Sequence, residues 1–212
     1  MRAIKIAFLL SAMIIPLGLS AESQAPQNQT IKDFYLSNYK ENGSRDWEIK
    51  GTEAIVQDKF VNIDNMEAKY YSKDDVMSIK SDKAKLNKDN MNASLKDNIE
   101  VTIPTEGGKE YTTITCDGPL EMEYNEGNAV FNNRVVVTNQ GGKLYCDKAY
   151  VFFDTTAKKM NRIVAEGNVQ IVREDNITYA QKATYYVDTK KVVLEGSPRL
   201  IYYPKEKKES ST

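Results

Sequence analysis

Histidine is absent from this 212-residue chain, and tryptophan and cysteine are scarce, at one and two residues. Without histidine there is no histidine general base, no Ser-His or Cys-His nucleophile pair and no His-ligated zinc. Carboxylates, lysines and tyrosines remain as chemical groups. We therefore predict a protein that is not an enzyme and carries neither a cofactor nor a metal.

An excess of either charge is also missing. Lys and Arg total 29 against 30 Asp and Glu, a formal net charge of -1. This balance gives no electrostatic reason to expect a nucleic-acid partner. With 41% hydrophobic and 28% charged residues, the chain is too apolar to be disordered and is typical of a soluble folded protein of one or two domains.

Long hydrophobic runs are missing beyond the N-terminus. Residues 1–21 carry Arg2 and Lys5, and then an uncharged run of 14 residues, Ile6 to Leu19. As a helix this run spans roughly 21 Å, against the roughly 30 Å of a bilayer core. Pro16 and the small residue Ala21 favour a cleaved export signal, and a short uncleaved membrane anchor is the alternative. Both place the folded part outside the cytoplasm.

Composition then divides the rest of the chain. Residues 22–33 are polar and rich in Pro and Gln, which is typical of a linker, and residues 204–212 form a charged tail. The predicted folded region is 34–203. Apolar and polar residues alternate there, as in Met91–Leu95 and Leu120–Tyr124. A period of two indicates strands with one buried face, and no stretch favours an amphipathic helix.

A repeat of about 30 residues runs through the second part of the chain. The sequence Asp-Lys-Ala occurs at 82–84 and 147–149, with related copies at 117–120 and 181–183. Such a period predicts stacked units of about two strands each around one continuous core. The expected fold is all-β, a twisted open β-jelly roll of short antiparallel strands. The small Ala of each unit indicates a crowded inside corner where the strand bends.

The two cysteines occupy equivalent positions of this repeat. Cys116 and Cys146 each precede an Asp. If their repeats lie on neighbouring strands, about 4.8 Å apart, the thiols reach disulfide geometry, and an exported chain meets an oxidising compartment. The alternative is two small core residues that fill the same slot in each repeat.

Short motifs carry a resemblance to a known family. Tyr39, Gly43, Trp47, Ile49 and Ala54 follow one another as in the first strands of the periplasmic domain of LptC. The later Asp-Lys-Ala units, with Glu-Gly-Asn-Val at 166–169 and Glu-Gly-Ser-Pro at 195–198, are similar to repeats of the OstA/LptA group. The resemblance extends over residues 34–203.

That resemblance implies a periplasmic lipid-binding bridge or adaptor. The family's jelly roll holds the acyl chains of lipopolysaccharide or a related glycolipid and passes them towards the outer membrane. It implies like-folded Lpt proteins as partners at the edge strands, here 34–39 and 199–203, and an ATP-hydrolysing ABC transporter in the inner membrane. The expected location is the periplasm, either free or tethered to the inner membrane.

Alternation gives the candidate lipid-binding residues, each of which could instead be ordinary core. The interior lining is predicted to consist of Ile49, Ala54, Val56, Ile79, Ala84, Leu86, Leu95, Leu120, Met122, Ala149, Val151, Phe153, Val169, Ile171, Ala183, Tyr185 and Leu194. Two other functions stay open at this point. One is a repeat-built envelope scaffold without a lipid ligand, and the other is an exported carbohydrate-active enzyme with a carboxylate pair.

Overall fold

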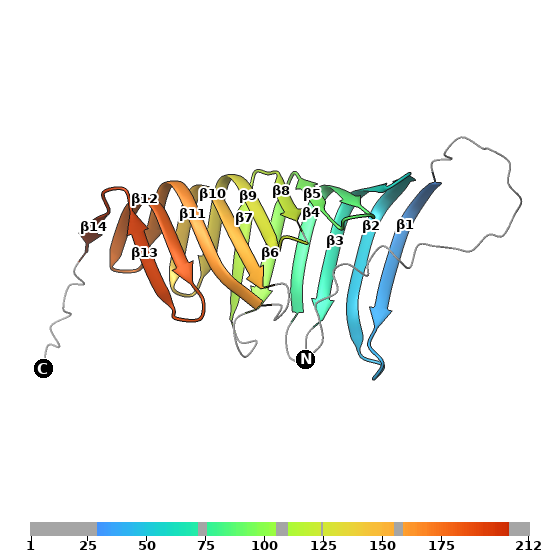
Figure 1. The fold of residues 1–212 in the computed structure, drawn as a ribbon, viewed down its shortest axis with the longest axis horizontal. Helices are drawn as coiled ribbons and strands as arrows, with labels where there is room; N and C mark the ends of the chain where they lie inside the picture. Colours follow the sequence, from blue (N-terminus) through green and yellow to red (C-terminus); the bar gives the residue numbers. More distant parts are fainter. Residues whose placement is uncertain (1–28, 72–75, 105–109, 124, 155–158, 204–212) are drawn as a thin grey trace, which may run out of the picture.

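The computed structural model describes residues 29–71, 76–104, 110–123, 125–154 and 159–203. Within these ranges the chain forms no helix, and its strands make one antiparallel sheet of 14 strands (Figure 1), which confirms the all-β jelly roll. In chain order the strands are β1 (Gln29–Tyr39), β2 (Arg45–Gln57), β3 (Phe60–Tyr71), β4 (Val76–Asn87), β5 (Ala93–Lys96), β6 (Ile99–Pro104), β7 (Tyr111–Cys116), β8 (Leu120–Glu123), β9 (Asn128–Asn139), β10 (Gly142–Asp154), β11 (Lys159–Val172), β12 (Asn176–Tyr186), β13 (Lys191–Glu195) and β14 (Arg199–Tyr202).

The sheet begins earlier than composition predicted. Residues 29–33, assigned to the linker, form the first part of β1 and pair with β2, with Ile31 opposite Ala54. An edge strand has neighbours on one side only, so a mostly polar stretch can still form it. The predicted export segment 1–21, the rest of the linker and the tail 204–212 lie outside the described residues.

Many strands are long and bent, which corrects the expectation of short strands. β4 pairs with β6 through Ser78–Lys80 and with β5 through Lys83–Leu86, so its two ends have different partners. β9 is shared in the same way by β7 and β8, and β12 by β14 and β13. The sheet therefore has a first half, containing β6, β7 and β14, and a second half, containing β5, β8 and β13. We call the bend between the two halves the corner.

Residues with a left-handed backbone mark the corner. Asn65 of β3, Asn133 of β9 and Gly167 of β11 have φ of 51°, 63° and 76°. The pairing register skips residues at the corresponding points, as between Cys146 and Lys148 of β10. Gly lacks the Cβ that disfavours this conformation, and Asn tolerates it better than most residues. These residues therefore allow long strands to turn from one half of the sheet into the other.

Aspartates of the repeat hold the corner together. Asp82 Oδ2 accepts a hydrogen bond of 2.6 Å from Asn98 Nδ2, and Asp147 Oδ2 accepts one of 2.9 Å from Asn168 Nδ2. Asp117, in the weaker copy of the repeat, forms an ion pair with Arg134. The repeat thus places an acceptor beside a donor of the neighbouring strand or bend. Its copies fall on alternate bent strands, so one period corresponds to two strands, as predicted.

Candidate functional site

An apolar inner face runs the whole length of the sheet. Its residues lie opposite one another from strand to strand, so they form rows across the sheet. The first inner row, in the first half of the sheet, is Leu36, Ile49, Ala68, Ile79, Val101, Ile114, Val137, Leu144, Ile171, Thr178 and Leu200. Only Thr178 is polar, so the row presents an almost unbroken hydrocarbon surface.

Two further rows lie in the second half of the sheet. The second inner row, next to the corner, is Ile31, Ala54, Ile63, Ala84, Leu95, Leu120, Phe131, Ala149, Ala165, Ala183 and Leu194. The third inner row, farther from the corner, is Gln29, Val56, Val61, Leu86, Ala93, Met122, Ala129, Val151, Ile163, Tyr185 and Val192. Most members of the three rows belong to one hydrophobic cluster, so the two halves pack together.

Burial of the inner-face residues varies along the strands. In β4, Ala84 beside the corner is buried, whereas Ile79 and Leu86 on either side are only partly buried. β11 repeats this gradient, because Ala165 and Val169 are buried while Ile171 is partly exposed. Residues at the corner therefore form an ordinary core. Farther along the strands, some residues such as Ile49 and Val151 are also buried, whereas others such as Ile79 keep apolar surface in contact with water.

The structure places the residues predicted to line the interior in the three inner rows, with the exception of Val169 and Phe153. Val169 is buried beside the corner, opposite Ala180. Phe153 is 37% exposed at the end of β10, where the register shifts. The extra residue at this shift, Asn161, lies in β11. Alternation along β10 therefore continues to Phe153, but it does not indicate how much of a side chain at the strand end is exposed.

Several members of the rows were missed because their local sequence does not alternate. Val137 ends a run of three valines, 135–137, in which both faces are apolar. Val101 and Ile114 lie in runs with threonine, which suits either face of a strand. Pairing with Ile79 on one side and Val137 on the other assigns them to the first row. Only the register of neighbouring strands supplies this assignment.

The two cysteines are free and buried, so the disulfide is absent and that alternative was wrong. Cys116 lies on β7 and Cys146 on β10, and β9 runs between these strands, with Val135 opposite Cys146. Two strand spacings are about 9.6 Å, beyond the reach of a disulfide. Ser81 and Ala180 occupy the same repeat position and are also buried. The position therefore requires a small side chain. Burial raises the pKa of Cys146 to about 12 and also raises that of Cys116.

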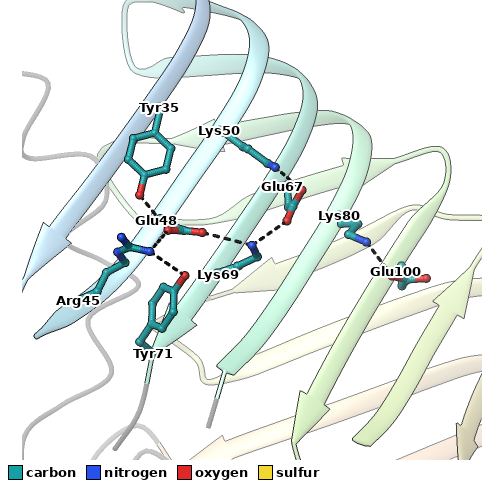
Figure 2. A network of polar contacts seen from close by, with 9 residues as sticks. All are labelled: Tyr35, Arg45, Glu48, Lys50, Glu67, Lys69, Tyr71, Lys80 and Glu100. Carbon is teal, nitrogen blue, oxygen red and sulfur yellow. Dashed lines mark hydrogen bonds and ion pairs between the residues drawn. The ribbon is translucent and has the colours of Figure 1, made fainter.

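The outer face at the N-terminal end carries a network of charges (Figure 2). Glu48 of β2 accepts hydrogen bonds from Tyr35 of β1 at 2.9 Å and from Arg45 at 2.8 Å. Lys69 of β3 lies 3.4 Å from the other carboxylate oxygen of Glu48 and 3.2 Å from Glu67. Opposite charges on facing strands stabilise one register over others. The network therefore ties the edge strand β1 to β2 and β3.

The pKa of Glu48 reflects this setting. Burial works to raise it, but hydrogen bonds from Tyr35 and Tyr71 and the nearby charge of Lys69 outweigh burial, so the pKa lies below its usual value. Glu48 is accordingly ionised at neutral pH. The pair of Lys80 and Glu100, 3.3 Å apart, continues the outer row but stands in solvent. Within the described ranges, no three acidic or cysteine side chains gather to hold a metal. No described helix has the length and apolarity to cross a membrane.

Fold and inner face together define an open β-jelly roll with a continuous apolar interior. Comparison with protein families identifies the family to which the chain belongs. The model described as lipopolysaccharide-assembly, LptC-related, matches residues 18–145, more than half of the chain. The chain belongs to this LptC-related family. A second model, described as LptA/(LptD N-terminal domain) LPS transport protein, matches residues 113–211. No curated protein matches the sequence significantly.

Family membership indicates the general role of the protein. Lpt proteins are transport and binding proteins of the cell envelope, and the chain is accordingly a component of lipopolysaccharide transport. The two family matches overlap between residues 113 and 145, where β7 to β10 lie within the same unbroken sheet. LptC-like and LptA-like sequence features thus share one fold and one inner face in this protein.

Proposed function

We propose that the inner face shields the acyl chains of lipopolysaccharide and passes them along the sheet towards the outer membrane. The observation that carries the proposal is the continuity of the three inner rows. Each exposed CH₂ group costs about 0.8 kcal/mol in water, so an acyl chain cannot cross an aqueous space without cover. A row with one apolar residue per strand offers the same contact at every step, which supports movement along the sheet.

The differences in burial indicate which residues touch the lipid. Buried residues already have full contact with protein, whereas the partly buried members of the first and third rows retain exposed apolar surface. We therefore assign lipid contact to the partly buried members of these rows. They are Leu36, Val56, Ala68, Ile79, Leu86, Ala93, Met122, Val137, Leu144, Ile163 and Ile171. The lining residues beside the corner, such as Leu120, would serve as core.

Both ends of the sheet support docking of like-folded Lpt proteins. At each end of the sheet at least one inner row ends in an exposed apolar side chain, namely Ile31 on β1 and Val192 and Leu200 on β13 and β14. Leu200 is 66% exposed. A further strand added at either edge would cover these residues and extend the rows. Pairing of β1 and of β13–β14 with partner edges is thus part of the proposal.

The proposal also includes the energy source for lipid transfer and the location of the protein. Nothing in the described ranges supplies energy for transfer against a gradient, so we assign that task to an ABC transporter in the inner membrane. The N-terminal 21 residues would direct the chain to the periplasm, either as a cleaved signal or as a short tether. N-terminal sequencing of the exported protein tests this part directly, since a mature chain beginning near Glu22 indicates cleavage.

Photocrosslinking in cells tests the lipid contact. A photoreactive residue replaces Met122 or Ile171, and the outward neighbours Glu121 and Gln170 serve as matched controls. We expect lipopolysaccharide adducts at Met122 and Ile171 only. Leu120, which is buried beside the corner, is expected to give none. Equal adducts at inner and outer positions, or none at any inner position of a folded and exported chain, would favour an envelope scaffold instead.

A further inference from the structure

A buried indole N–H without an acceptor stands on the inner face near its N-terminal end. Trp47 is 3% exposed, and its Nε1 has no hydrogen-bond partner among the described residues. Most buried N–H groups in proteins are paired, because an unpaired one loses its bond to water without replacement. The exception is notable here because Trp47 is the only tryptophan of the chain.

The position of Trp47 in the sheet indicates which kind of acceptor could pair with its indole N–H. Trp47 lies on β2 two residues before Ile49, on the side away from the corner. It is therefore farther from the corner than the first inner row. Its neighbours across the sheet are Asn38 on β1 and Tyr70 on β3. Beyond it, at the beginning of β2, the charged Arg45 reaches the outer network. Trp47 therefore marks a boundary between hydrocarbon and polar surroundings.

An acylated glycolipid also has a boundary between hydrocarbon and polar groups, and it lies at a single chemical group. Each acyl chain begins at an ester or amide carbonyl next to the sugar, with hydrocarbon on one side and polar groups on the other. With its chains against the inner rows, this carbonyl would lie at the rim. A neutral carbonyl oxygen suits the site better than a phosphate, because Ile49 and Leu36 give it an apolar setting in which a charge is costly.

Resting on the function proposed above, we propose that Trp47 Nε1–H donates a hydrogen bond to the ester or amide carbonyl at the head of a bound acyl chain. Trp47 is itself buried, so the ligand would reach the indole only if the side chain of Tyr70, which lies opposite Trp47 and is only partly buried, moved aside. The same contact would select acyl chains over alkyl chains without a carbonyl. Trp47 is thus a positioning residue for the lipid head.

Two soluble lipids and two variants test this contact. The probes are dioctanoyl phosphatidylglycerol, with ester carbonyls, and its dioctyl ether analogue, which lacks them. Calorimetric titration of the full-length chain measures both affinities. Trp47→Phe keeps the aromatic ring but removes the N–H. Ile49→Val changes packing in the same region without changing a polar group.

We expect the wild-type chain to bind the ester probe about 5- to 10-fold more tightly than the ether probe, the value of one hydrogen bond. Trp47→Phe should remove this preference by weakening ester binding alone, whereas Ile49→Val should preserve it. Equal binding of both probes by the wild type, or an unchanged preference in Trp47→Phe, overturns the role of Trp47 and leaves the lipid-binding face intact. Binding of neither probe overturns the lipid-binding function, and the role of Trp47 with it.

Discussion

Single residues in this protein owe their chemistry to the face of the sheet on which they lie. The thiols of Cys116 and Cys146 point into a crowded core beside the corner, so both stay protonated and are poor nucleophiles. Glu48 lies on the opposite face, where three strands surround it with donors and it stays ionised. The inner face therefore suppresses charge, and the outer face uses charge to hold neighbouring strands together.

Burial of Cys146 predicts slow thiol chemistry and a loss of stability at high pH. Because the folded-state pKa of about 12 lies above the usual value of 9.0, the unfolded chain ionises first. The free energy of unfolding should therefore fall as the pH rises from about 9 towards 12, and less steeply in Cys146→Ala. Urea titrations at several pH values measure both. A thiol reagent should label the folded chain far more slowly than the unfolded chain. Rapid labelling of both cysteines under native conditions would contradict their burial.

The pKa of Glu48 predicts the opposite dependence in acid. A carboxyl whose folded pKa is depressed stabilises the fold above its unfolded pKa, near 4.5, and this contribution is lost as the pH falls through the folded pKa. Glu48→Gln should lower the free energy of unfolding by about 1 kcal/mol at pH 7, and the difference should vanish in stronger acid. As a control, Glu100→Gln breaks an exposed ion pair and should cost less than about 0.5 kcal/mol. Equal costs for both variants would show that the network around Glu48 adds nothing.

Among the structural elements, the bent strand is the unit of the fold. Each period of the repeat supplies two such strands. At the corner it also supplies a hydrogen-bond acceptor, such as Asp147, and a residue with a left-handed backbone, such as Gly167. The corner lets one long strand cover both halves of the sheet. The inner rows remain continuous because every strand bends at the same level.

Two glycines with nearly equal backbone angles separate conformational strain from crowding at the corner. Gly43 and Gly167 have φ of 78° and 76°. A Cβ on Gly43 would meet nothing within 4 Å, whereas one on Gly167 would lie 2.4 Å from Asp147 Oδ2. Gly43→Ala should therefore cost about 1 kcal/mol from strain alone. Gly167→Ala should cost about 3 kcal/mol, since Asp147 must also leave its bond with Asn168. Urea midpoints measure both, and equal costs would exclude a packed corner.

The whole molecule is a sheet whose two ends differ in chemistry. The N-terminal end is secured by the charged network on its outer face. At the C-terminal end, β13 and β14 both pair with β12 and carry exposed Val192, Leu200 and Tyr202. Exposed apolar residues on an edge strand promote pairing with another strand. The C-terminal end is therefore the stronger candidate for a docking edge.

Leu200→Asp tests this edge without disturbing the core. Because Leu200 is exposed, the variant should fold with an unchanged melting temperature. Its charge would be buried against an incoming strand, so crosslinking from position 203 to a like-folded Lpt partner should fall at least about 10-fold. Asn139→Asp adds the same charge at the exposed end of β9 and keeps the acceptor for Gly141. A similar loss with Asn139→Asp, or no loss with Leu200→Asp, would exclude docking through β14.

The sequence by itself determined the fold class, the family and many members of the inner rows. Alternation has a period of two whatever the partner strand is, and the repeat reports a regular stack, so residues such as Ala84 and Leu120 could be placed from local pattern. It did not determine which strands are neighbours. For that reason Cys116 and Cys146 were allowed a bond that β9 prevents, and Val101 and Val137 went unassigned. Tertiary structure decided these points, and it also distinguished core residues from partly exposed ones, because burial depends on how the two halves of the sheet pack together.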